Sequence, residues 1–341
     1  MQQSIVMTSS MAELCNVSDI AHKNPYVMCV QNFQLPIGIF AVYATYQVTN
    51  STRFRQVFNI ASPALRVLLN ITKLAYFFGG FTTFVLYFYT MIRYNIYSGD
   101  CRTAWSVGEC IAVRLPSYYC FFVVSLTHAA LMIDRMLVTF CRKYYDGGKG
   151  TAMLYAAIIF SLSIISSVYV YGQEEYSKII FACITSSALA REHLVQVMTT
   201  YFVIGIITAI GDGLVFAVCK KRFVNKVDYY NFYTLNKSVD IRENRLSIKV
   251  VLPLSIVHLA FTMPMIASFP LGSLFVWVDS TSILLYVETV SMVKNLYFLL
   301  SPIVLTCFYI CFAKDVTDEW LDRKTNQAEE HFRQLHSTLQ L

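Results

Sequence analysis

The segment that decides the fold is residues 110–135, CIAVRLPSYYCFFVVSLTHAALMIDR. A cysteine stands at its start and the pair Asp134-Arg135 at its end, and no Asp, Glu, Lys or Arg lies between Leu115 and Ile133. As a helix rising about 1.5 Å per residue, the segment is roughly 38 Å long, which is enough to cross a hydrocarbon core of about 30 Å. We therefore predict a membrane-spanning helix with the cysteine at one face and the charged pair at the other.

The composition of the chain is that of an integral membrane protein. Its 341 residues are 56% hydrophobic and 14% charged, whereas soluble domains carry about 25% charged residues. The net charge of +6 is modest and does not indicate a nucleic-acid partner. No basic segment followed by an apolar run marks a cleaved signal peptide, so we expect the first span to act as a signal anchor.

Six further apolar segments accompany the central one. We expect them at residues 33–48, 74–92, 151–171, 197–219, 250–271 and 282–312. Within 197–219, the sequence Gly211-Asp212-Gly213 is expected to interrupt the helix. The predicted fold is an all-α integral membrane protein with a bundle of seven transmembrane helices, formed by one domain over residues 1–341.

The distribution of basic residues orients this bundle. Segments on the side of the C-terminal tail hold eighteen Lys and Arg residues, and segments on the other side hold six, among which we count Arg114 with the charges before the third span. The positive-inside rule then places the tail, 313–341, in the cytosol and the N-terminus, 1–30, outside. Asn16 of the sequence Asn16-Val17-Ser18 thereby becomes a candidate glycosylation site. An inverted seven-helix channel would need the opposite charge bias.

Two cysteines fall on the predicted outer side, Cys110 at the top of the third span and Cys183 in the long loop after the fourth. A disulfide between them would tie that loop across the helix tops and restrict access to the bundle. Cys101 is an alternative partner for Cys183, which could also be free, and spacing alone does not fix the pairing. We favour Cys110–Cys183 because Cys110 lies one helix length from Arg135.

The pair Asp134-Arg135 has two interpretations. A charged pair at a cytosolic helix end can simply anchor the helix in the membrane interface. Alternatively, Asp134 holds Arg135 at rest and releases it toward an intracellular partner. The helix-length spacing from Cys110 favours the second interpretation.

Charged residues inside the predicted spans are Asp212, Glu288 and Lys294. An unpaired charge at membrane depth costs several kcal/mol, so we expect all three to face the interior of the bundle. Lys294 lies near mid-depth of the last span, where it would contact a ligand, pair with a carboxylate or be structural. Glu288 lies about 1.7 turns away, so the two residues do not share a helix face.

Prolines in the last two spans are candidate hinges. Pro264 and Pro302 each remove a helix hydrogen bond and permit a kink, which could serve as a hinge or be a static bend. His128 and His258 are more typical of hydrogen-bonded interior histidines than of proton switches.

Taken together, these features resemble those of G-protein-coupled receptors, and the closer likeness is to nematode serpentine chemoreceptors of the Sra/Srab group. The residues that carry the likeness are Cys101, Cys110, Ile133-Asp134-Arg135 with Thr139, Tyr144-Tyr145, Tyr233-Thr234-Leu235, Ile241-Arg242-Glu243-Asn244 and Leu252-Pro253. The chain departs from the rhodopsin-like pattern, because Met136 follows Arg135, no Trp precedes Pro264, and Pro302 lacks the neighbouring Asn and Tyr.

The resemblance implies a chemosensory receptor of the plasma membrane, or of a sensory cilium, that couples to a heterotrimeric G protein and needs no cofactor or metal. A small extracellular molecule, or a peptide, would bind among the outer halves of the helices. The candidate contacts are Tyr118, Tyr119, Phe122, Glu288 and Lys294.

Two other function classes fit the sequence less well. A transporter or ligand-gated channel would line its pathway with Asp212 and Lys294, but the sequence has no repeated halves with matched broken helices. An enzyme is disfavoured, because no HExxH, GxSxG or clustered His-Asp motif appears.

Overall fold

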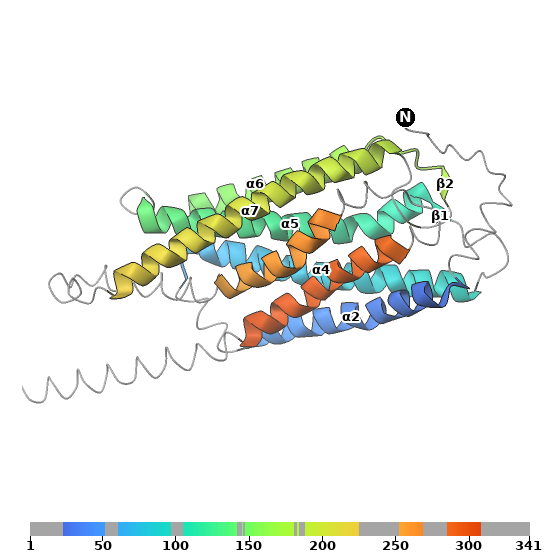
Figure 1. The fold of residues 1–341 in the computed structure, drawn as a ribbon, viewed down its shortest axis with the longest axis horizontal. Coiled ribbons are helices and arrows are strands. Elements are labelled where there is room, and N and C mark those ends of the chain that lie inside the picture. Colours follow the sequence, from blue (N-terminus) through green and yellow to red (C-terminus); the bar gives the residue numbers. More distant parts are fainter. Residues whose placement is uncertain are drawn as a thin grey trace, which may run out of the picture.

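The structure is a computed structural model that describes residues 23–51, 61–96, 105–141, 145, 147–180, 183, 188–224, 252–268 and 285–307. Within these ranges the chain forms seven helices and one two-stranded sheet. The helices are α2 (Pro25–Asn50), α4 (Pro63–Ile96), α5 (Val107–Phe140), α6 (Lys149–Tyr171), α7 (Ala188–Val224), Leu252–Ser268 and Leu285–Cys307. They lie lengthwise beside one another in one elongated bundle, as the all-α prediction required (Figure 1).

Six of these helices are long and apolar enough to cross a bilayer, and Leu252–Ser268 is a shorter apolar helix. Large apolar side chains on their outer faces are exposed, among them Phe40 on α2 and Ile165 and Val168 on α6. Outward apolar surface of this kind is stable in lipid, where a helix satisfies all its backbone hydrogen bonds internally. The chain is therefore a multi-pass membrane protein.

Helix α5 is the central helix of the bundle. In its most apolar window 72% of the residues are buried, compared with 28% in the corresponding windows of α2 and α6. It runs through the middle of the assembly, between the α6–α7 pair and the pair formed by α2 and Leu285–Cys307 (Figure 1). The segment 110–135 thus forms the axis around which the other helices pack.

Several helices begin earlier than predicted. Helix α2 starts at Pro25, eight residues before the expected span, because the Asn24 side chain accepts a hydrogen bond from the backbone N–H of Tyr26 and proline suits the first helical position. The predicted extracellular segment 1–30 therefore ends in helix. Helix α5 starts at Val107 behind a capping box, in which Ser106 and Glu109 bond each other's backbone N–H groups.

The expected interruption of the fifth span is wrong, because α7 continues as helix through Gly211, Asp212 and Gly213. A broken helix in lipid would leave backbone groups without partners, which outweighs the weak helix propensity of two glycines. Gly211 instead provides space, since a Cβ there would lie 2.4 Å from the sulfur of Met132 on α5.

Helices α2 and α4 approach each other closely through small residues. A Cβ on Gly38 would lie 2.7 Å from the backbone nitrogen of Phe84, and a Cβ on Gly80 would lie 2.8 Å from the Cβ of Ala41. Close contact between small residues is a usual way for membrane helices to gain packing energy without a hydrophobic driving force.

Candidate functional site

The loop after α6 is fastened over the start of α5 at one end of the bundle. Strand β1 (Trp105–Ser106) pairs antiparallel with β2 (Ile179–Ile180), and Val107 donates a backbone hydrogen bond of 2.8 Å to Lys178. The structure also contains the favoured disulfide, Cys110–Cys183, with a Cα–Cα distance of 5.1 Å. Cys101 lies outside the described residues. The sheet and disulfide together form a cap over this end of the bundle.

Trp105 anchors the cap and was not singled out by the sequence analysis. It is fully buried, it donates from Nε1 to the hydroxyl of Tyr94 at 2.9 Å, and the guanidinium of Arg93 lies 4.6 Å from its ring centroid. It packs in a small apolar cluster with the two disulfide cysteines. The sequence around Trp105 does not reveal that it anchors the cap. Its strand pairs with Ile180, more than seventy residues away, and a pairing at that distance cannot be read from the local sequence.

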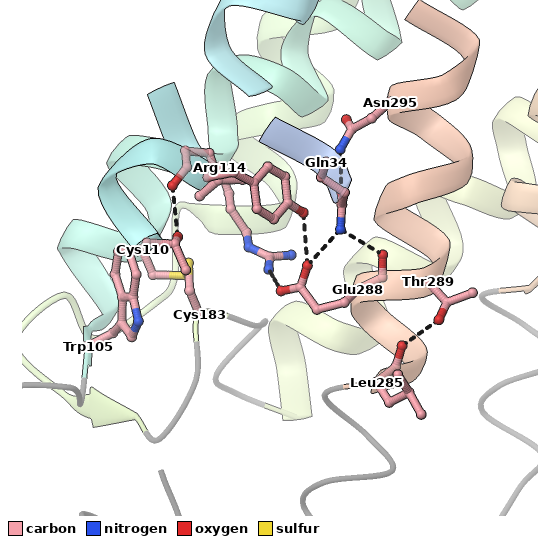
Figure 2. Close-up of polar contacts among 12 residues, drawn as sticks. Gln34, Trp105, Cys110, Arg114, Cys183, Leu285, Glu288, Thr289 and Asn295 are labelled. Carbon is pink, nitrogen blue, oxygen red and sulfur yellow. Dashed lines mark hydrogen bonds and ion pairs between the residues drawn. A yellow bond between two sulfur atoms is a disulfide. The ribbon is translucent and has the colours of Figure 1, made fainter. Parts of the chain in front are cut away.

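A buried ion pair lies below the cap (Figure 2). Nη2 of Arg114 on α5 donates to Oε1 of Glu288 on Leu285–Cys307 at 2.8 Å, and both side chains are almost completely buried. The other carboxylate oxygen, Oε2, accepts from the hydroxyl of Tyr87 at 2.9 Å and from Nε2 of Gln34 at 3.2 Å. Both oxygens of Glu288 are therefore occupied.

The same network continues deeper into the bundle. Asn295 donates to Oε1 of Gln34 and accepts from the hydroxyl of Thr83 at 2.9 Å. Side chains from α2, α4, α5 and the last described helix are thus connected through one set of hydrogen bonds around Glu288. We refer to Gln34, Thr83, Tyr87, Arg114, Glu288 and Asn295 as the outer polar cluster.

Arg114 shows where the sequence reasoning failed. It was counted among the loop charges of the outer side, but it lies inside α5 and pairs with Glu288. The signal that could have found it is its position four residues after Cys110, one helical turn into the span, where a charge requires a partner.

Lys294 lies on a different side of its helix from Glu288, as the helical spacing predicted. Its Nζ donates to the hydroxyl of Ser117 at 2.7 Å and lies 4.4 Å from the ring centroid of Tyr118. Among the described residues no carboxylate lies within ion-pair distance of Nζ.

The aromatic ligand candidates divide into two groups. Tyr118 and Phe122 are buried in the core, where the Phe122 ring lies 5.0 Å from that of Tyr201 on α7. Tyr119 is only partly buried and packs at the edge of the core. The structure therefore brings Tyr118 together with Lys294, while Tyr119 does not join that contact.

A second polar group, the central His-Tyr cluster, lies farther along α5. The rings of His128 and His258 stack with centroids 4.1 Å apart, and the Tyr297 hydroxyl contacts both, at 2.7 Å from Nδ1 of His258 and 3.3 Å from Nε2 of His128. Tyr76 bonds the same hydroxyl at 3.1 Å. Four helices meet at Tyr297, and both histidines have interior hydrogen bonds.

The opposite end of α5 carries a closed charged pair. Nε of Arg135 donates to Oδ2 of Asp134 at 2.9 Å, and both side chains are essentially inaccessible. Tyr145, which follows α5, donates its hydroxyl hydrogen to Oδ1 of Asp134. Burial, together with the bond to Asp134, raises the pKa of Tyr145 well above its ordinary value, so the phenol stays protonated as the donor. Tyr145 thus reinforces the hold of Asp134 on Arg135.

The remaining predicted sites are less informative. The helices continue through Pro264 and Pro302, with the Pro302 carbonyl accepting from Thr306 at 2.8 Å. Asn16 lies outside the described residues. Asp212 is buried on α7, and its Oδ2 has no hydrogen-bond partner among the residues that the structure describes. In the described part of the chain, no group of His, Cys, Asp and Glu is arranged to hold a metal ion.

The described helices thus carry a disulfide-fastened cap at one end and a buried Asp-Arg pair at the other. A comparison of the sequence with known protein families agrees with this arrangement. Residues 12–340 match the family model described as serpentine type 7TM GPCR receptor class ab chemoreceptor. The chain belongs to the class ab serpentine chemoreceptors. No curated protein matches the chain. The family is one of receptors, not of enzymes, and the match agrees with the resemblance found in the sequence.

Within this receptor, the polar groups form three levels along α5. Arg114 is four residues from the disulfide at Cys110, His128 lies in the central cluster, and Arg135 is at the far end. At about 1.5 Å per residue, Arg114 and Arg135 are separated by roughly 32 Å along the helix. Buried polar contacts therefore lie near both ends of α5 and at its middle.

Proposed function

We propose that the protein is a G-protein-coupled chemosensory receptor that binds a small extracellular molecule below the cap and activates a heterotrimeric G protein at the opposite face. The observation that carries this proposal is the closed arrangement of Asp134, Arg135 and Tyr145. Arg135 is buried and pairs with Asp134, so a movement that separates the two groups would leave a charge without its counter-ion and favour its exposure to an intracellular partner. The family match supports the same assignment.

The proposed topology places the cap outside the cell and Arg135 at the cytosolic face of the plasma membrane. The excess of basic residues on the tail side supports this orientation, and so does the disulfide, because disulfides persist in oxidising compartments. In this orientation Asn16 is an extracellular glycosylation site, and the tail 313–341 is cytosolic. We propose a sensory cilium as the location of the receptor, as the resemblance to chemosensory receptors implies.

The mechanism follows from the levels of polar contact along α5. A ligand contacting Tyr118 or Lys294 would alter the packing of α5 against Leu285–Cys307 near the outer polar cluster. Tyr297, on the same last helix, connects that change to His128 and His258. Movement of these helices would separate Asp134 from Arg135 and open the cytosolic face. The ligand shifts this equilibrium only by its different affinity for the two states.

The experiment compares wild-type receptor with Arg135→Ala in cells that report activation of several G-protein classes. Asp134→Asn is the companion variant, because loss of the carboxylate charge releases Arg135 without removing it. We expect Asp134→Asn to raise basal G-protein activation and the double variant Asp134→Asn/Arg135→Ala to lose the increase. Lys149→Ala, at an exposed position on the same face, is the control.

Equal basal signals from all variants at matched surface expression would contradict the role of the pair. Ligand-dependent current in cells lacking G proteins would instead support the transporter or channel alternative.

A further inference from the structure

Two buried cations lie below the cap, and they differ in their partners. Arg114 pairs with Glu288, whereas Lys294 has no carboxylate within ion-pair distance among the described residues. Glu288 forms its ion pair with Arg114, and its two carboxylate oxygens also accept hydrogen bonds from Tyr87 and Gln34. Both oxygens are therefore already in use. Lys294 is only 4% exposed and has the Ser117 hydroxyl and the face of Tyr118 as partners.

These two partners do not compensate a buried ammonium group. A hydroxyl is a neutral acceptor for one of the three N–H bonds of lysine, and a tyrosine ring is a weak attraction compared with an ion pair. A charge at membrane depth without a counter-charge costs several kcal/mol. The other carboxylates of the described residues do not pair with Lys294. Glu109 pairs with Arg93, Asp134 pairs with Arg135, and Asp212 is beside Gly211, which packs on Met132 toward the far end of α5. Glu174 is also buried, but it lies in the loop after α6 and makes no ion pair with Lys294.

The position of Lys294 is suited to a ligand that arrives through the capped end. Ser117 is seven residues from the disulfide-bonded Cys110, or about 10 Å along α5. The side chains around it are aromatic, with Tyr118 in contact and Phe122 one turn deeper against Tyr201. An acid group at Lys294 would thus have apolar surface beside it.

From this charge arrangement we infer that the receptor's ligand is a small organic monoanion, whose acid group pairs with Lys294 and whose apolar body packs against Tyr118 and Phe122. The inference rests on the proposed chemoreceptor function and specifies its ligand class. A single acid group is sufficient, because one ammonium group, that of Lys294, lacks a carboxylate within ion-pair distance among the described residues. Arg114 is not the recognition residue, since its counter-ion is already provided by Glu288.

The test measures the thermal unfolding midpoint, Tm, of the purified receptor in the absence of any G protein. Sodium benzoate and sodium hexanoate are the probes, benzamide and hexanamide are their neutral counterparts, and sodium chloride matches the ionic strength. We expect both carboxylates to raise the Tm of wild-type and Lys294→Arg receptor by about 2 to 4 °C, as for a ligand at roughly tenfold its dissociation constant. Lys294→Met should abolish the shift.

The ligand-free proteins give an independent readout. Lys294→Met should have a higher ligand-free Tm than wild type, because it removes an uncompensated buried charge. Arg114→Met, at almost the same depth, should have a lower Tm, because it leaves Glu288 without its counter-ion. The inference is overturned if no carboxylate shifts the Tm, if the amides act equally well, or if Lys294→Met lowers the ligand-free Tm.

The Tm measurement tests ligand binding independently of G-protein coupling. Arg135→Ala should retain the carboxylate-dependent Tm shift, because Arg135 lies at the opposite end of α5. A retained shift in a receptor whose Asp134 and Arg135 variants leave signalling unchanged would overturn the coupling role alone.

Discussion

At the scale of single residues, the described helices contain two buried ion pairs that differ in their connections. Arg114–Glu288 joins two helices and is embedded in a set of further hydrogen bonds from Gln34 and Tyr87. Asp134–Arg135 joins neighbours on one helix, and its additional support comes from Tyr145 in the following loop. The first pair is placed to hold helices together, and the second is placed to be opened by movement of a loop or helix end.

The first prediction concerns Tyr145. Tyr145→Phe removes the hydroxyl donor to Asp134 and should weaken the closed state by about 1.5 kcal/mol, the lower range for a hydrogen bond to a charged group. This corresponds to roughly a tenfold change in the resting equilibrium, which should appear as raised basal G-protein activation at equal surface expression. Tyr169→Phe, an exposed position on α6, is the matched control. Basal activation identical to wild type would exclude a restraining role for the phenol.

The second prediction concerns Arg114 and Glu288. Arg114→Met or Glu288→Leu alone leaves one buried charge unpaired and should destabilise the receptor by about 3 to 5 kcal/mol. The double variant removes both charges and should recover most of that loss. Thermal unfolding of the four proteins in one detergent measures the cycle. Additive losses would show that the two residues do not stabilise each other.

At the scale of helices, the packing depends on where small residues allow close approach. Gly38 and Gly80 bring α2 and α4 together, and Gly211 accommodates the side chain of Met132 on α5. The two kinds of contact differ, because the neighbour of Gly38 is backbone and the neighbour of Gly211 is the end of a flexible side chain. Backbone cannot move aside without shifting a whole helix.

The third prediction uses this difference. Gly38→Leu places a Cβ at 2.7 Å from the Phe84 backbone nitrogen and should reduce the yield of folded receptor severely. Gly213→Leu is the matched control, because nothing lies within 4 Å of a Cβ built there. Size-exclusion profiles and surface labelling measure the folded fraction. Comparable yields from the two variants would mean that α2 and α4 do not require this close approach.

At the scale of the whole molecule, the cap and the closed Asp134–Arg135 pair lie at opposite ends of α5. This separation makes the receptor proposal depend on orientation, because only one arrangement exposes the cap to the ligand and Arg135 to a G protein. The charge bias and the disulfide both support the same arrangement.

The fourth prediction tests orientation directly. An epitope tag before Met1 should be accessible to antibody on intact cells, and a tag after Leu341 should become accessible only after permeabilisation. Asn16→Gln should increase gel mobility to that of enzymatically deglycosylated receptor. Accessibility of both tags on intact cells would contradict an odd number of spans, and an accessible tail alone would invert the proposed topology.

The sequence by itself determined the fold class, the central helix and the placement of Cys110 and Asp134-Arg135 at its two ends. Each of these follows from one helix considered alone: an uncharged stretch long enough to span a bilayer, with groups separated by one helix length. The pairing of Cys110 with Cys183 was favoured by the sequence, and the structure decided it. Local chemistry also sets the start of α2 at Asn24-Pro25, although the hydrophobic pattern placed it later, because capping depends on residues outside the apolar run.

Only the tertiary structure decided which buried charges have partners. Glu288 pairs with Arg114, 174 residues away, and Lys294 has no carboxylate within ion-pair distance among the described residues. Helical periodicity gives the face of a helix on which a charge lies, but it does not give the neighbouring helix toward which that face turns. That choice is made by packing between helices, through close contacts such as Gly38 against Phe84. The same packing places Lys294 beside Ser117 and Tyr118 and not beside a carboxylate of the described residues.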